Sequence, residues 1–240
     1  MKNEQNTHNH PVVDIKNLKK SFQNNEVLTN INLEIVKGSN AVIIGQSGIG
    51  KSVLIKCMVR LIEPDGGNIS IFGEEITTLD EERLNTIRKK IGFLFQGNAL
   101  YDSMTVRENL EFPLVRNKLV NSRRDIDARV FEALDNVGLR KTIDQMPSEL
   151  SGGMKKRIGL ARTLILKPDI ILYDEPTTGL DPITSKEISN LIVDIQKKYQ
   201  TTSIIITHDI NCVKMTSNII HVMKDGIFYA SGTYEEMEKS

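Results

Sequence analysis

The segment GQSGIGKS, residues 45–52, constrains the fold of this chain more than any other part of the sequence. It fits the pattern GxxxxGK[ST] and lies between a strand-like apolar run and a predicted helix, the context in which this pattern binds phosphate. The glycines allow backbone N–H groups to approach phosphate oxygens, and the following helix adds the positive end of its dipole. The segment therefore predicts a phosphate-binding loop within an α/β fold.

Four short apolar runs predict the central strands of that fold. They lack the alternation of a half-exposed strand, which is typical of strands buried on both faces. Predicted helices separate the runs, so we expect them to form a mostly parallel sheet. The runs are AVIIG (41–45), IGFLF (91–95), IILY (170–173) and SIIIT (203–207).

Segments nearer the two ends of the chain have a different pattern. VDIKNLKKSF (13–22) and VLTNINLEIVKG (27–38) alternate more strongly and are separated by QNNE, which predicts an antiparallel sheet near the N-terminus. Asp225-Gly226 stands between two apolar runs and predicts a C-terminal β-hairpin.

The middle of the chain, about 97–165, contains no comparable strand run. It is rich in charge and has helical spacing through Val130, Leu134 and Val137. We therefore expect a polar tail at 1–10 and one domain at 11–240, in which a helical lobe is inserted into the α/β core.

The composition argues against several classes of protein. Lys+Arg and Asp+Glu both total 31, so the basic footprint of a nucleic-acid-binding protein is missing and no nucleic-acid partner is expected. Cys57 and Cys212 have no metal-binding spacing and are expected to be reduced, as in the cytoplasm. No apolar run approaches the ~18 residues of a membrane span. These features predict a soluble cytoplasmic protein.

Polar side chains directly follow the predicted core strands. Gln96 follows the second run, Asp174 and Glu175 follow the third, and His208 follows the fourth. Ligands of open parallel sheets bind beyond the carboxyl ends of the strands, so we expect these side chains in one crevice with the phosphate loop. Gln96 is a candidate Mg²⁺ ligand that senses the γ-phosphate. His208 is a candidate donor to that phosphate or to the attacking water.

The remaining groups of the predicted site have separate tasks in phosphoryl transfer, which needs positioning and charge stabilisation. Lys51 is expected to reach the β- and γ-phosphates. Ser52 and Asp174 are expected to ligate Mg²⁺. Glu175 is the candidate to orient and polarise the attacking water.

A second candidate anion site lies about a hundred residues later, at LSGGMKKR (150–157). A serine and two glycines open a predicted helix there and offer free backbone N–H groups. The basic run at 155–157 is expected to be a solvated or interface face. Phe22, at the end of a predicted strand, is a candidate to stack on adenine, although an aromatic residue there is also often part of the core.

With these motifs, residues 12–240 resemble the nucleotide-binding subunit of an ABC transporter. The resemblance implies an ATPase that uses ATP and Mg²⁺. It implies an ABC-type P-loop NTPase fold: a RecA-like, mostly parallel sheet core, an N-terminal antiparallel β-subdomain and an inserted α-helical subdomain. The motifs that carry it are GQSGIGKS as Walker A, Gln96 as the Q-loop, LSGGM as the signature, IILYDEP as Walker B, TGLDP (178–182) as the D-loop and His208 as the switch histidine.

The resemblance also explains the second helix start. Two subunits of such transporters pair head to tail, and the signature of one completes the ATP site of the other, which implies a homodimer through shared ATP sites. Val53 stands where many members of the family have a second threonine. The residues implied to contact the nucleotide are Phe22, Gly45, Ser47, Gly48, Gly50, Lys51, Ser52, Val53, Ser151, Gly152, Gly153 and Asp181.

Three segments, GKSVL, FQGNALYDSMTVRENLEFPL and LSGGMKKR, look most like MlaF-type ATPases of bacterial phospholipid transport. This similarity implies a MlaE-like transmembrane permease and an MCE-domain substrate-binding protein as partners. It implies a cytoplasmic subunit on the inner face of the cell membrane, with the segment after Gln96 against the permease. Two alternatives share the catalytic motifs: a transporter for another solute such as amino acids, and a soluble ABC ATPase of DNA repair or iron–sulfur cluster assembly. Repair or translation roles would be favoured by coiled-coil insertions or a second cassette, which the sequence lacks.

Overall fold

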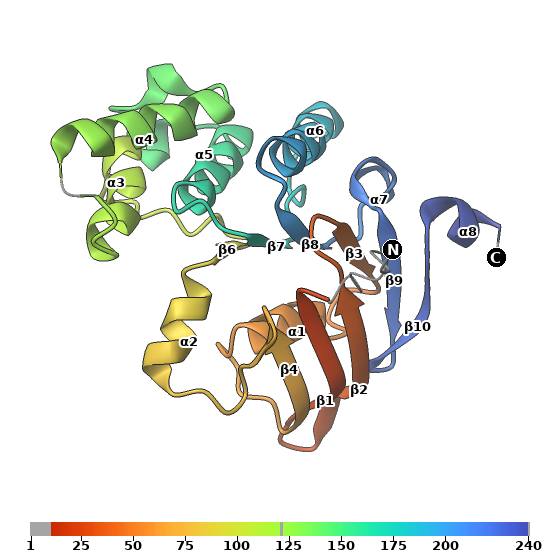
Figure 1. The fold of residues 1–240 in the computed structure, drawn as a ribbon. Coiled ribbons are helices and arrows are strands. Elements are labelled where there is room, and N and C mark those ends of the chain that lie inside the picture. Colours follow the sequence, from red (N-terminus) through yellow and green to blue (C-terminus); the bar gives the residue numbers. More distant parts are fainter. Residues whose placement is uncertain (1–10, 121, 240) are drawn as a thin grey trace, which may run out of the picture.

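The larger of two sheets positions the predicted site. The structure, a computed structural model, describes residues 11–120 and 122–239. Within them, six strands form a sheet in the order β10-β9-β3-β8-β7-β6 (Figure 1). Their bounds are β3 Asn40–Ile44, β6 Ile91–Leu94, β7 Ile170–Asp174, β8 Thr202–Ile206, β9 Ile219–Lys224 and β10 Ile227–Gly232. The four predicted core strands are confirmed.

The pairing in this sheet matches the predicted pattern. β3 pairs in parallel with β8 and β9, and β7 pairs in parallel with β6 and β8. β10 returns antiparallel to β9, so the predicted hairpin is also confirmed. Its turn residues Asp225 and Gly226 have φ of 49° and 74°, as a two-residue hairpin turn requires.

The second sheet has four strands in the order β2-β1-β4-β5. The predicted antiparallel pair is present, but its second strand begins at Asn25 instead of Val27 and ends at Ile35. The sequence interpretation missed β4 and β5, which extend the sheet beyond β1. The bounds are β1 Val13–Phe22, β2 Asn25–Ile35, β4 Gly66–Ile71 and β5 Glu74–Glu75.

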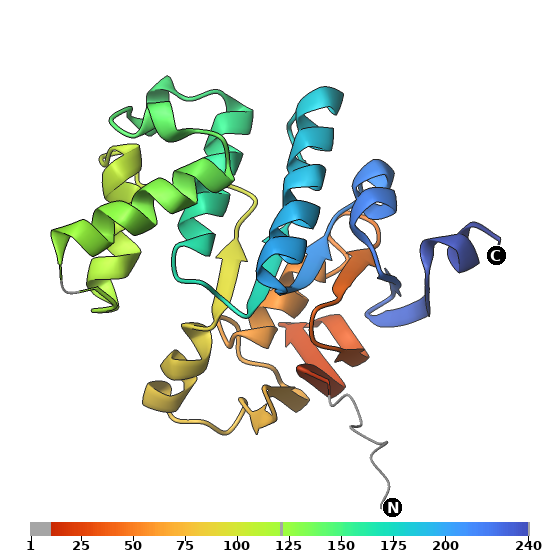
Figure 2. The ribbon, with the colours of Figure 1, turned by 45° about the horizontal axis from the view of Figure 1, so that its top comes forward.

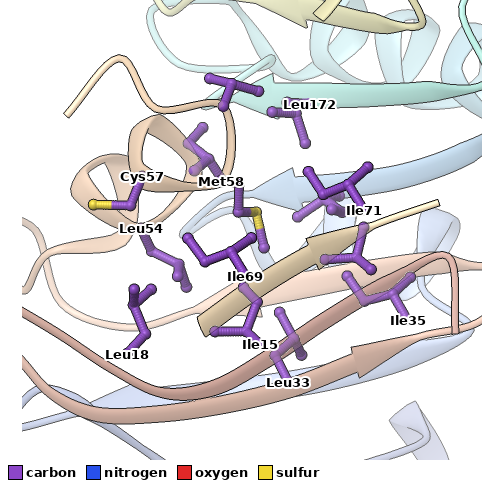
Figure 3. Packing of buried hydrophobic residues seen from close by; sticks show 14 of the residues in the cluster. Ile15, Leu18, Leu33, Ile35, Leu54, Cys57, Met58, Ile69, Ile71 and Leu172 are labelled. Atoms are coloured by element: carbon purple, nitrogen blue, oxygen red, sulfur yellow. The ribbon is translucent and has the colours of Figure 1, made fainter. Parts of the chain in front are cut away.

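Helix α1 (Lys51–Met58) packs between the two sheets. Leu54 and Met58 on the helix lie among Ile15 and Ile69 of the small sheet, and Leu172 of β7 closes the cluster from the other side (Figure 3). Every one of these side chains is at most 1% exposed. The burial of this apolar surface holds the phosphate loop, which immediately precedes α1, against both sheets.

The opposite face of the six-stranded sheet is covered by α6 (Pro182–Tyr199), α7 (Ile210–Thr216) and part of α5 (Gly152–Leu164). Ile171 and Tyr173 of β7 point to this layer, whereas Leu172 points to α1. Both faces of the sheet are therefore buried, which explains why its strands lack an alternating sequence pattern.

Three helices between β6 and β7 form a group with a core of its own, to one side of the large sheet (Figures 1 and 2). They are α3 (Val106–Arg116), α4 (Arg123–Asn136) and α5, and two 3₁₀ turns, Arg140–Thr142 and Pro147–Glu149, lie between α4 and α5. Val130 and Leu134 are fully buried, as their helical spacing predicted. The division into domains stays a prediction, and the predicted polar tail at 1–10 lies outside the described residues.

The remaining helices are α2 (Glu81–Arg88), which precedes β6, and the short α8 (Tyr234–Glu238) after β10. Asp80 caps α2 by accepting a hydrogen bond from the Arg83 N–H at 2.8 Å. Cys57 and Cys212 are buried free thiols.

Candidate functional site

The phosphate loop runs from the end of β3 to the start of α1. Gly50 precedes the helix with φ of 109°, and a Cβ atom there would lie 2.6 Å from Cγ1 of Val27, so glycine is required on both counts. The Lys51 ammonium donates to the carbonyl oxygens of Gly45 and Gln46, at 2.8 and 2.9 Å. Two carbonyls of the loop therefore bind the Lys51 ammonium, and the first N–H groups of α1 lie next to it in the chain.

Lys51 is only 5% exposed, which is unusual for a lysine. Burial lowers the pKa of its ammonium, and the nearby carboxylates of Glu175 and Asp174 act in the opposite direction. A partly desolvated cation is a strong partner for a phosphate group because the surroundings screen the attraction less than water does.

Ser52 and Asp174 meet at the end of β7. The Ser52 hydroxyl donates to Oδ1 of Asp174 at 2.8 Å, and Asp174 is 5% exposed. The hydroxyl and carboxylate oxygens are hard ligands of the kind Mg²⁺ prefers, and Mg²⁺ on a nucleotide uses only one or two protein groups. The donor set therefore fits the predicted ion.

Glu175 is held firmly in position. Its backbone has φ of 51°, in the left-handed region, and its N–H donates to the Ile206 carbonyl of β8 at 2.9 Å. Its Oε2 accepts from the Thr178 hydroxyl at 3.0 Å and lies 2.9 Å from Nδ1 of His208. Strain of this kind at a strand end is typical of functional sites, and here it aims a mostly buried carboxylate at the phosphate loop.

These groups surround one open cleft. The structure brings together predicted residues from four strand ends and adds Phe22, whose ring is 44% exposed at the rim. Val27 is an additional wall residue outside every predicted motif, and Thr178, the first residue of the TGLDP motif, lines the cleft although no role was predicted for it. The cleft is lined by Phe22, Val27, Ser47, Gly48, Gly50, Lys51, Ser52, Val53, Gln96, Glu175, Thr178 and His208.

The second predicted phosphate site lies elsewhere. Ser151 caps α5, accepting from the Met154 N–H at 3.3 Å, and both Ser151 and Gly152 are exposed. A Cβ atom on Gly153 would lie 2.5 Å from Cγ2 of Thr184 at the start of α6. The signature residues thus pack beside the D-loop of their own chain and do not line the cleft.

Asp181 does not line the cleft either. It caps α6 by accepting from the N–H groups of Ile183 and Thr184, both at 3.0 Å, and from the Thr184 hydroxyl. Hydrogen bonds from these groups keep the pKa of its carboxyl below the usual value. In the single chain its role is that of a helix cap.

The basic run at 155–157 was predicted to be a solvated or interface face, and its middle residue departs from the solvated alternative. Lys156 is 3% exposed, and its ammonium donates to the backbone carbonyls of Gln96 and Glu175. Arg157 pairs with Glu187 at 2.7 Å. Lys156 stands four residues before the buried Leu160, so helical spacing could have placed it on the inner face of α5.

Comparison with known proteins decides the family. The family model described as "ABC transporter" matches residues 28–178. The chain belongs to the ABC transporter family. Its fold is that of the family's ATPase domain: the ATP-binding cassette MJ0796, solved as a dimer in a post-hydrolysis state with ADP and Pi, superposes with a TM-score of 0.85 at 33% identity, over 92% of this chain and 98% of that one.

Two further relatives belong to named transport systems. Structurally, cbiO1 of Clostridium perfringens, part of the ABC transporter complex cbiONQ, has a TM-score of 0.88 at 30% identity, over 96% of this chain and 92% of that one. In sequence, the methionine import ATP-binding protein MetN of Brucella abortus is 36% identical over 92% of this chain. The probable ribonucleotide transport ATP-binding protein mkl of Mycobacterium leprae is 41% identical over 84% of it.

The chain spans 60% of MetN and 58% of mkl, so it matches only part of these curated relatives. Across residues 11–120 and 122–239, no helix has both the length and the apolar character needed to cross a bilayer.

Proposed function

We propose that this chain binds ATP with Mg²⁺ in the cleft and hydrolyses it to drive transport through a membrane permease. The observation that carries the proposal is the convergence of two side-chain pairs on one cleft, Ser52 with Asp174 and Glu175 with His208, 2.8 and 2.9 Å apart. A metal-binding pair and a base–imidazole pair beside a phosphate loop are the parts that nucleotide hydrolysis needs.

Each side chain has a defined task in this mechanism. Lys51 and the loop N–H groups bind the terminal phosphates. Ser52 and Asp174 would hold Mg²⁺, which would supply positive charge against the phosphate oxygens. The Glu175 carboxylate orients a water and accepts its proton. His208 and Thr178, bonded to the same carboxylate oxygen, fix its direction.

We propose that the complete site needs two chains. In the single chain, the exposed start of α5 at Ser151 and Gly152 does not line the cleft, and the first N–H groups of a helix suit a phosphate. Two chains related by a two-fold axis would each place this helix start on the other's nucleotide. The dimeric state in which the MJ0796 cassette was solved supports this arrangement.

A permease surface is proposed on and around α3, in the segment that follows Gln96. Tyr101, Phe112, Val115 and Leu119, on and around α3, are 38–58% exposed. Large apolar side chains that share an exposed surface mark an interaction site. An occupant on the cytoplasmic side of a permease would place the chain at the inner face of the cell membrane, as predicted.

For the cargo, we propose phospholipid, with a MlaE-like permease and an MCE-domain protein as partners. The proposal is supported by the segments GKSVL and LSGGMKKR and the segment after Gln96. Neither MetN nor mkl carries a lipid in its name. An amino acid such as methionine is the second candidate, favoured by the 36% identity to MetN.

The nucleotide role is tested with Lys51→Ala. The variant removes the cation at the centre of the loop, so ATP affinity measured by calorimetry should fall by about 100-fold, the order expected for a charge-assisted contact to phosphate. Lys141→Met, an exposed lysine of the helical group, is the control and should bind like the parent. Unchanged affinity in Lys51→Ala would overturn the proposed site.

The cargo is tested by purifying the tagged chain from gently solubilised membranes, with mass spectrometry of co-purifying chains and lipids. A multispanning permease with an MCE-domain partner and bound phospholipid supports the lipid proposal. A permease with a receptor for a small solute replaces the cargo and keeps the ATPase. A soluble partner without a permease overturns the transport role.

A further inference from the structure

Among the residues that the structure describes, Lys156 is the most deeply buried charged group outside the predicted site residues. It lies one turn into α5, after the signature residues, and is 3% exposed. Its Nζ lies 2.6 Å from the Gln96 carbonyl oxygen and 3.4 Å from the Glu175 carbonyl oxygen. One side chain from the helical group thus contacts the ends of two core strands, β6 and β7.

The same face of α5 contacts the segment after β6 at successive turns. Lys156 donates to the Gln96 carbonyl, and Arg162 donates to the Ala99 carbonyl. Between them Gly159 packs against Asn98, where a Cβ atom on Gly159 would lie 3.2 Å from the Asn98 carbonyl oxygen. Asn98 and Ala99 have φ of 64° and 52°. Such backbone conformations are costly and persist only where surrounding contacts fix them.

The backbone of Glu175 is also in the left-handed region, with φ of 51°. Its N–H donates to the Ile206 carbonyl of β8, and its carbonyl oxygen accepts from the Thr178 N–H at 3.3 Å and from the Lys156 ammonium at 3.4 Å. Removal of the Lys156 ammonium would take from the Gln96 carbonyl the donor at 2.6 Å and from the Glu175 carbonyl one of two donors, so both peptide units would be freer to turn. The amide of Gln96 and the carboxylate of Glu175 would then be held less firmly, the carboxylate by Thr178 and His208 alone.

Resting on the proposed ATP hydrolysis, we propose that Lys156 is a positioning residue that links the signature helix α5 to the backbones of Gln96 and Glu175. Through these hydrogen bonds it fixes the positions of the Gln96 amide and the Glu175 carboxylate relative to α5. The ammonium touches neither nucleotide nor water in this role. Because α5 also carries Ser151 and Gly152, one element sets both ends of the shared site.

The test uses Lys156→Met, which keeps the length of the side chain and removes its donors. ATP affinity by calorimetry should stay within about twofold of the parent, while kcat falls about 10- to 100-fold, the loss expected when reacting groups shift by up to an ångström. Lys156→Gln, which restores an N–H donor without the charge, should recover most of kcat. Lys141→Met, the exposed control, should match the parent.

A second readout does not depend on turnover. The amide of Gly97 shares a peptide unit with the Gln96 carbonyl, so its ¹H–¹⁵N resonance reports loss of the hydrogen bond from Lys156. We expect this resonance to shift in nucleotide-free Lys156→Met and to stay in place in Lys141→Met. If Lys156→Met does not fold, Lys156→Ala carries both measurements.

Two results would overturn the proposal while leaving the ATPase assignment intact: parental kcat in a folded donor-free variant, or an equal loss of kcat in Lys156→Met and Lys156→Gln with an unmoved Gly97 resonance. Failure of both the parent and Lys141→Met to hydrolyse ATP would instead contradict the proposed function.

Discussion

Gly92 on β6 provides a sharp test of how closely α5 must approach the large sheet. Gly92 is buried, and a Cβ atom there would lie 2.5 Å from Cγ2 of Thr163 on α5 and 3.0 Å from Cγ of Pro168. Favourable carbon contacts are about 3.5–4.0 Å, so Gly92→Ala requires a displacement of about 1 Å by the helix or the methyl group. Turning Thr163 away would break the bond from its hydroxyl to the Gly159 carbonyl, 2.9 Å long.

The expected cost follows from these distances. Overpacking of this degree costs about 1–3 kcal/mol, and the reduced freedom of the unfolded chain returns about 0.4–1 kcal/mol. Gly92→Ala should therefore lower the free energy of unfolding by about 1–2 kcal/mol. Thr163→Ser removes the obstructing methyl and keeps the hydroxyl, so it should recover about 1 kcal/mol in the double variant.

The assay is urea unfolding followed by circular dichroism, with the four proteins compared as a double-mutant cycle. Gly97→Ala is the matched control, because its added Cβ meets nothing within 4 Å, and it should lose no stability. If Gly92→Ala costs the same in the Thr163→Ser background, the contact with that methyl is not the cause and the reasoning fails.

Three further predictions concern catalysis, assembly and pH. Glu175→Gln should bind ATP like the parent but release phosphate about 10²–10⁴-fold more slowly at saturating ATP, and near-parental turnover would remove Glu175 from its role. Gly152→Asp puts a carboxylate on the exposed start of α5, where a second chain's γ-phosphate is proposed to lie. It should spare ATP binding by the single chain and abolish turnover; robust hydrolysis would contradict the two-chain site. Burial lowers the pKa of His221 from 6.5 to about 4. The unfolded chain therefore takes up a proton that the folded chain does not, and unfolding free energy should fall as pH drops from about 6.5 to about 4. In His221→Gln this component should vanish, and an unchanged pH slope in denaturant titrations would refute it.

The strand ends could be predicted because the chemistry and the pattern agree there. Each core strand is a short β-branched run ended by a polar residue, and the order of these residues already implied a common crevice. β4 was missed because it begins with two glycines and buries only Ile69 and Ile71. Its strand character comes from pairing with β1, a tertiary contact that its own sequence does not encode.

Lys156 shows the opposite failure. Three adjacent basic residues indicated a solvated or interface face, yet the middle one is buried within its own chain. Its environment depends on two carbonyls, at residues 96 and 175, that are distant in the sequence. The helical spacing within α5 could have indicated that the Lys156 side chain points inward. Residues 96–99 have no apolar pattern, so the sequence did not indicate that they contact α5. Phe22 was open between core and site, and its exposure at the cleft rim favours the site.

The position of β3 at the centre of the large sheet has a consequence for synthesis. Both of its neighbours, β8 and β9, lie at residues 202–224, about 160 residues later in the chain. At about 5–20 residues per second, the ribosome needs about 8–32 seconds to supply them. Until then both edges of β3 lack their native partners and present free backbone groups to any extended peptide nearby. The nascent chain must therefore be shielded for most of its translation. A stall before residue 202 should yield an aggregation-prone product, in which the small sheet is complete but the large sheet beside the phosphate loop is not.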